Sequence, residues 1–158
     1  MDLLTALHDS AAIALLRGGR WSYAAVNAAH ILGFALLIGA IVPLDLRLIG
    51  WRRDVPLASL SRVLLPVAIT GLFVAAAAGF LLFAVRAPEY AAKPLFWAKM
   101  ALVVCGVVNA VLLHRAVAWE RAAAGIAATG ARLRLAGALS ITLWVAVLVC
   151  GRMLAFVD

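Results

Sequence analysis

The side chains best suited to chemistry are three basic residues inside long apolar runs: His30, Lys99 and Arg152. Each lies four positions in from the end of its run, so a rise of ~1.5 Å per residue places all three about 6 Å deep. Ionisable residues at membrane depth are costly and usually functional. We therefore predict one layer that binds an anionic or redox ligand, such as a haem propionate, a quinone carbonyl or a lipid phosphate. Alternatively, Lys99 and Arg152 extend to lipid headgroups and His30 makes one interhelical hydrogen bond.

Two cofactors suit this layer. A haem b bound to His30 needs a second axial ligand on the same side, and His8 and Met100 meet that requirement. Copper is the alternative, because the imidazole of His30 and the thioethers of Met100 and Met153 suit Cu(I). One haem shared by His30 and His114 is excluded, since these residues lie ~20 Å apart along the helices.

A second polar layer is expected near the opposite helix ends. Asp45 and His114 each lie three residues from the end of an apolar run. A carboxylate and an imidazole at one depth predict a structural ion pair that sets helix register.

Sequence patterns of common enzymes are absent. The chain has no GxSxG, HExxH, Walker A or GxGxxG motif. Its seven acidic residues lie mostly in tails and loops, so they form no evident catalytic pair. We therefore expect a non-catalytic protein.

The composition identifies the elements that must position these residues. Of the 158 residues, 67% are hydrophobic and 13% are charged, against ~45–50% and ~25% in soluble domains. The mean hydropathy is +1.11. Such a chain cannot cover a water-facing surface, which excludes a soluble enzyme. The net charge of +7 comes from single basic residues at the ends of apolar runs, which indicates a lipid bilayer and not nucleic acid as the partner.

Four runs are long enough to cross a bilayer. We place the spans at 26–48, 63–85, 95–117 and 134–156, within one transmembrane domain at 21–158. Short connections predict an all-α, antiparallel four-helix bundle. Residues 1–20 are too polar to span, and Leu3, Leu7, Ala11 and Leu15 recur every four positions. This spacing predicts an amphipathic helix at the interface.

Small residues recur on two spans, at Gly71, Ala75 and Gly79 and at Gly137, Ser140 and Gly151. Such rows let helix backbones approach closely. We expect helix contacts within the bundle, or a contact with a second copy of the chain.

The basic residues also predict an orientation. Eight lie on the side of the first and third connections and six on the side of the termini. The positive-inside rule then places both termini in the periplasm. The eight are Arg47, Arg52, Arg53, Arg62, Arg115, Arg121, Arg132 and Arg134; the six are Arg17, Arg20, Arg86, Lys93, Lys99 and Arg152.

Several strings carry a resemblance: Ala-His-Ile-Leu-Gly at 29–33, Asp-Leu-Arg-Leu-Ile-Gly at 45–50 and Gly-Arg at 151–152. The pattern resembles a family of small bacterial four-helix membrane proteins without an assigned activity. The architecture is loosely similar to copper-resistance protein D and to b-type cytochrome bundles. The resemblance implies a bacterial inner-membrane protein. The leading hypothesis is a subunit that holds haem b or copper near His30. The alternatives are a structural or assembly subunit and, third, a small-solute transporter or channel.

Overall fold

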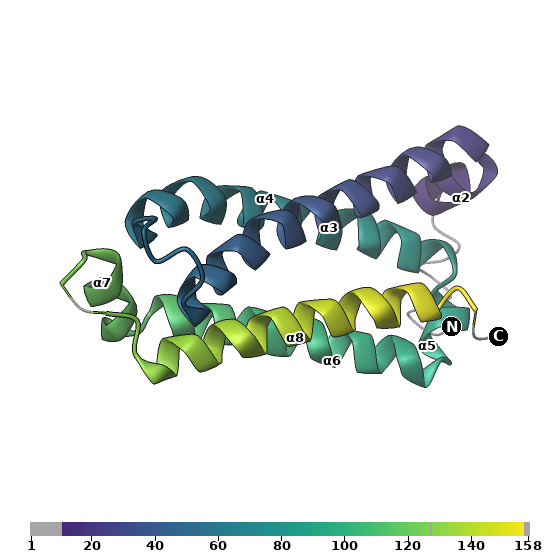
Figure 1. Cartoon of the computed structure of the whole chain (residues 1–158). Helices are drawn as coiled ribbons and strands as arrows, with labels where there is room; N and C mark the ends of the chain where they lie inside the picture. The colour runs from purple at the N-terminus through teal and green to yellow at the C-terminus, as the bar shows by residue number, and fades with distance from the viewer. Residues whose placement is uncertain (1–10, 127, 157–158) are drawn as a thin grey trace. The chain divides into compact units, whose positions relative to one another are not determined.

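The computed structural model describes residues 11–126 and 128–156. This part of the chain is all-helical and contains no strand. The helices can be followed in Figure 1. They are α2 (Ala11–Gly18), α3 (Arg20–Ile49), α4 (Leu57–Val85), α5 (Ala87–Ala91), α6 (Pro94–His114), α7 (Val117–Ala123) and α8 (Ala131–Met153).

The four long helices α3, α4, α6 and α8 are long and apolar enough to cross a membrane. They contain 30, 29, 21 and 23 residues, and their most apolar windows have mean hydropathies of 2.0 to 2.3. The chain therefore has the helices of a multi-pass membrane protein. Pro43 lies inside α3 and Pro66 inside α4, without ending either helix.

The helix bounds differ from the predicted spans in two ways. Helices α3 and α4 each begin six residues before the predicted spans 26–48 and 63–85, because the helix continues through the polar flanks. Helix α6 ends at His114, three residues before the expected end of its span. The chain turns at Arg115–Ala116 and forms the short helix α7, which the sequence analysis did not predict.

The contacts divide the chain into two compact units. Unit 1 comprises residues 1–37 and 69–94, and unit 2 comprises residues 38–68 and 95–158. Helices α3 and α4 contribute to both units, whereas α6, α7 and α8 belong to unit 2 apart from Pro94.

In unit 1, α3 and α4 meet backbone to backbone. A Cβ atom on Gly33 would lie 2.5 Å from the Ala75 nitrogen, and one on Gly71 would lie 2.6 Å from the Leu37 nitrogen. Only glycine permits this approach. The small-residue row on the second span is thus confirmed as a helix contact. Elsewhere in the unit, Ile13 of α2 packs on Ala84 and Val85 of α4.

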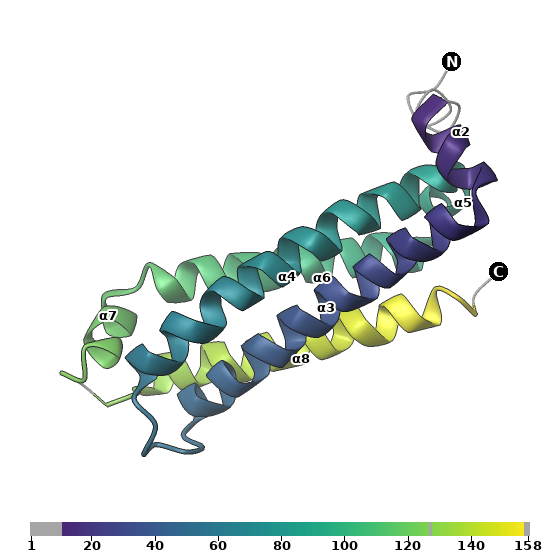
Figure 2. The same cartoon turned by 90° about the horizontal axis from the view of Figure 1, so that it is seen from above.

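Unit 2 has its core near one set of helix ends, where α7 lies at the same end of the unit as the turn between α3 and α4 (Figures 1 and 2). Buried apolar side chains from all five helices of the unit meet there. They are Leu44 and Leu48 of α3, Leu57 of α4, Leu113 of α6, Trp119 of α7 and Leu133 of α8. This core fixes the heights of the polar residues on α3, α6 and α8.

Candidate functional site

His30 lies in the contact between α3 and α4. Its Nδ1 is 2.8 Å from the carbonyl oxygen of Ala75 on α4. A carbonyl only accepts hydrogen bonds, so Nδ1 carries the proton and Nε2 carries the lone pair in the neutral ring. The ring also lies over Gly79, where an added Cβ would be 2.9 Å from Cε1. Two of the three small residues on α4 therefore position the imidazole.

The other residues of the predicted outer layer belong to unit 2. The side chain of Lys99 on α6 lies against Gly151 of α8, where an added Cβ would be 3.5 Å from Cε and Nζ. The Arg152 guanidinium lies 4.8 Å from the centre of the Phe156 ring. Because His30 belongs to unit 1, a layer that joins it to Lys99 and Arg152 stays a prediction.

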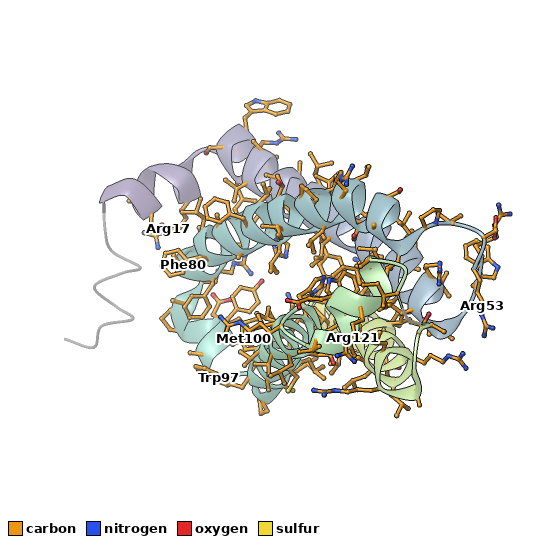
Figure 3. The ribbon with its side chains drawn as sticks, turned by 90° about the vertical axis from the view of Figure 1, so that its left-hand side faces the viewer. Arg17, Arg53, Phe80, Trp97, Met100 and Arg121 are labelled. Atoms are coloured by element: carbon orange, nitrogen blue, oxygen red, sulfur yellow. The ribbon has the colours of Figure 1, made fainter. Side chains whose placement is uncertain are left out.

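The predicted ligand sets for metal or haem also stay predictions. Met100 projects from α6 (Figure 3) and Met153 is 47% exposed on α8, both in unit 2. His8 lies outside the described residues. Within the described ranges, no three His, Cys, Asp or Glu side chains group in a way that would hold a metal ion.

The expected ion pair between Asp45 and His114 is not formed. Within residues 11–126 and 128–156, the ion pairs are Arg52–Asp54 and Arg86–Glu89, both exposed. His114 instead places Nδ1 2.7 Å from the carbonyl oxygen of Ala110, one turn earlier on α6. Equal depth did not bring the two side chains together, because the rotation of each helix about its axis directs them to different neighbours.

Asp45 faces α8. Its backbone packs on Gly137, where an added Cβ would lie 3.0 Å from the Asp45 carbonyl oxygen. The side chain of Ser140, one turn along α8, lies beside the Asp45 carboxyl group. Both side chains are buried, with 4% and 5% of their surface exposed. Asp45 therefore lies in a neutral polar environment.

Helix α6 contacts the same stretch of α8. The Asn109 side-chain amide donates a hydrogen bond of 3.0 Å to the carbonyl oxygen of Ala136. The indole ring of Trp144 lies against Gly106, where an added Cβ would be 3.1 Å from its Cζ2. Asp45 of α3 and Asn109 of α6 thus meet α8 within residues 136–144. This stretch of α8 carries Ser140 and Trp144.

This convergence was only partly expected from the sequence. Ser140 was placed on a helix contact, but neither Ser140 nor Trp144 was assigned a polar role, and Asn109 and Asp45 were not joined to them. The available signal was a set of hydrogen-bonding side chains at similar depth on three spans. Depth alone does not show which of them share a helix face.

Two cavities lie at the polar ends of the units. The cavity in unit 2 has a volume of about 320 Å³ and is bordered by Arg47, Pro56 and residues of α7 and the following segment. Arg47 donates hydrogen bonds there to the carbonyl oxygens of Val55 and Arg53. The cavity in unit 1, of about 530 Å³, is lined by Arg17, Arg20, Tyr23, Val85, Arg86 and Glu89.

Tyr90 lies on α5, outside the spans. Burial raises the pKa of its phenol above 10.0; the negative charges of ionised Tyr23 and of Glu89 raise it further, and Arg86 opposes them. Tyr90 is therefore protonated at neutral pH and acts as a neutral polar group.

No protein-family model, curated protein or solved structure matches this chain.

Proposed function

We propose that this chain is a non-catalytic structural subunit of a bacterial inner-membrane complex. The observation that carries the proposal is the hydrogen bond from His30 Nδ1 to the Ala75 carbonyl oxygen at 2.8 Å. The histidine at membrane depth joins two helices whose backbones already touch at Gly33 and Gly71. Asn109 makes the same kind of bond from α6 to α8. Interhelical hydrogen bonds of this type stabilise membrane bundles by about 0.6–2 kcal/mol each.

The finer architecture belongs to the same proposal. The four spans form an antiparallel bundle, and the N-terminal segment lies at the outer interface as an amphipathic helix. Two features of α2 support the second point: Ile13 is 6% exposed and packs on α4, whereas Arg17 is exposed. The inner-membrane address and periplasmic termini are proposed from the resemblance and from the distribution of arginine.

A bound redox cofactor is the second candidate, and the orientation of His30 favours it. A histidine ligand commonly donates its second ring nitrogen to a carbonyl, which leaves the other nitrogen for the metal. In this chain Nδ1 of His30 lies 2.8 Å from the Ala75 carbonyl oxygen, the arrangement that the second nitrogen of a histidine ligand commonly has. A haem b at His30 would supply one-electron chemistry and would need a second ligand. The candidates are His8, which lies outside the described residues, Met100, which lies in the other unit, or a ligand from a partner chain. Copper needs further soft donors, and Met100 and Met153 lie in the other unit.

An optical spectrum, a metal analysis and a native mass of the detergent-purified protein separate these candidates. The structural proposal expects no Soret band, no stoichiometric copper, and a mass in gently extracted membranes well above the 16.6 kDa of the chain. Stoichiometric haem that is lost in His30→Ala would establish the cofactor function instead. A colourless protein that runs as a single chain would contradict the subunit proposal.

The role of His30 has its own matched control. His30→Ala should lower the thermal unfolding midpoint because the bond to Ala75 is lost. Asn27→Ala, one turn earlier on the exposed side of α3, should leave the midpoint unchanged. Equal midpoints for both variants would show that the histidine does not hold the helices together.

A further inference from the structure

Two helices of unit 2, α3 and α6, place polar side chains against one stretch of α8. Asp45 of α3 contacts Gly137 and Ser140, and α6 contacts the same stretch through Asn109 and Gly106. On α6 the residue numbers fall as the α8 numbers rise, because Asn109 meets Ala136 and Gly106 meets Trp144, so α6 runs antiparallel to α8 here. On α3, Leu48 and Asp45 both meet Gly137, which lies between these two contacts of α6.

Two buried polar atoms of the residues in these contacts have no hydrogen-bond partner in the described part of the chain. They are Oδ2 of Asp45 and Nε1 of Trp144. Both side chains are more than nine-tenths buried, with 4% and 2% of their surface exposed. A buried polar group without a partner is unfavourable, and more so inside a membrane, where lipid offers none.

The chemistry of the two atoms restricts what can satisfy them. Oδ2 of a carboxylate accepts hydrogen bonds, and an indole Nε1–H only donates. A metal cation would satisfy Asp45 and leave Trp144 without an acceptor, whereas an anion would do the reverse. A ligand that both donates and accepts serves both atoms. Neither atom is exposed, so the ligand must also be small.

We propose that unit 2 contains a buried water site between Asp45 and Trp144. The water donates a hydrogen bond to Oδ2 of Asp45 and accepts one from Nε1–H of Trp144. The Ser140 hydroxyl, one turn from Trp144 on α8, is the third polar neighbour. Buried waters in proteins have about three such partners. The role of the site is to hydrate a carboxyl group inside a membrane span.

The other polar and titratable groups of these helices do not replace the water. Asn109 uses its amide nitrogen on the Ala136 carbonyl oxygen, and Arg47 donates to Val55 and Arg53. His114 holds the Ala110 carbonyl oxygen and stacks on Trp119. The ion pairs of the described residues do not include Asp45. None of these groups therefore donates to Oδ2 of Asp45 or accepts from Nε1–H of Trp144.

The indole proton of Trp144 reports on the site directly. The chain has five tryptophans, so ¹⁵N-labelled tryptophan gives five indole signals, and Trp144→Phe identifies the one of interest. In deuterated micelles, we expect a cross-peak between the Trp144 Nε1–H and a long-lived water. Trp21, which is 82% exposed, should show only rapid exchange with bulk water.

Variants test the role of Asp45. Asp45→Leu removes the acceptor and should abolish the water cross-peak of Trp144. Asp54→Leu, at an exposed position, is the matched control and should leave it intact. A wild-type Trp144 signal without a water cross-peak would overturn the proposal, and that measurement holds even if Asp45→Leu does not fold. A cross-peak that survives in folded Asp45→Leu would overturn it equally.

Discussion

His114 shows how a polar residue can serve mainly as an aromatic one. Its ring centre lies 4.4 Å from that of Trp119 on α7, at an interplanar angle of 53°. Its Nε2 is buried and has no hydrogen-bond partner in the part of the chain that the structure covers. A buried polar atom without a hydrogen-bond partner lowers the stability of the fold by about 1–3 kcal/mol. An aromatic pair raises it by about 0.5–1.5 kcal/mol beyond the effect of burial.

Replacing this ring by an apolar one should therefore be tolerated. His114→Phe keeps the contact with Trp119 and removes the buried Nε2 that has no partner among the described residues, but it also loses the hydrogen bond from Nδ1 to the Ala110 carbonyl oxygen. Its thermal unfolding midpoint should thus lie close to that of the wild type. His114→Ala loses the ring contact and should unfold at lower temperature. Thermal unfolding in detergent measures both variants. A drop for His114→Phe as large as that for His114→Ala would show that hydrogen bonding by the imidazole matters more than its ring contact.

Tyr90 supplies a prediction about alkaline pH. The chain has two tyrosines, so Tyr23→Phe leaves Tyr90 as the one phenol to titrate. Because burial disfavours the phenolate, the absorbance of the tyrosinate should appear with a midpoint above pH 10.0. A midpoint at or below 10.0 in the folded Tyr23→Phe variant would contradict the burial.

The raised pKa of Tyr90 also predicts how the stability of the protein changes with pH. When the pKa of a group is higher in the folded state, the unfolded chain releases its proton first as pH rises. The contribution of Tyr90 to stability should therefore be constant below pH 10 and fall between pH 10 and the pKa of folded Tyr90. Tyr90→Phe should flatten this part of the pH profile of thermal unfolding.

The sequence indicates how deep each polar residue lies along its helix, but not which neighbouring helix its side chain faces. Asp45 and His114 were recognised because ionisable side chains are rare inside apolar runs. Their partners were not, because spans that are apolar on all sides carry no marker of which face meets a neighbour. The actual contacts, with Ser140, Ala110 and Trp119, depend on helix rotation. That rotation is set by where glycines such as Gly137 allow backbones to meet.

At the scale of elements, the contact between α3 and α4 depends on glycine. Gly71→Ala would place a Cβ 2.6 Å from the Leu37 nitrogen and 2.7 Å from the Gly33 oxygen, and these are backbone atoms that cannot rotate away. Overpacking of this kind costs about 1–3 kcal/mol. We expect a correspondingly lower free energy of unfolding in mixed micelles.

Gly39 on α3 provides the matched control for Gly71. It is exposed, and an added Cβ would meet nothing within 4 Å. Gly39→Ala should leave stability unchanged or raise it by up to about 1 kcal/mol through helix propensity. Equal losses in both variants would show that the cost arises from loss of glycine in a helix and not from the contact.

A hydropathy pattern predicts where the helices lie better than it predicts where they begin and end. The four long helices lie where the apolar runs predict them, because about 20 apolar residues in lipid have no alternative to helix. Helix α7 was missed because the apolar run of the third span continues into Val117–Ala118. The turn at Arg115–Ala116 and the burial of Trp119 in the core of unit 2 are tertiary effects, which a hydropathy pattern does not contain.

At the scale of the whole molecule, charge is distributed unevenly. The eight arginines of the first and third connections all belong to unit 2. Arg53 projects from the turn between α3 and α4, and Arg121 lies on α7 (Figure 3). Their nearest acidic neighbours in sequence outside the spans are Asp54 and Glu120. A strongly basic end of this kind favours the cytoplasmic side of the bilayer.

This distribution predicts the topology. With four spans, we expect the turn at residues 50–56 to face the cytoplasm and both termini to face the periplasm. A periplasm-dependent phosphatase fused after Asp158 should be active, and the same reporter inserted after Asp54 should be inactive. A fluorescent reporter that folds only in the cytoplasm should give the opposite pattern, which controls for expression. Active phosphatase at Asp54 would reverse the orientation and place His30 near the cytoplasmic face, so that any ligand of His30 would have to come from that compartment.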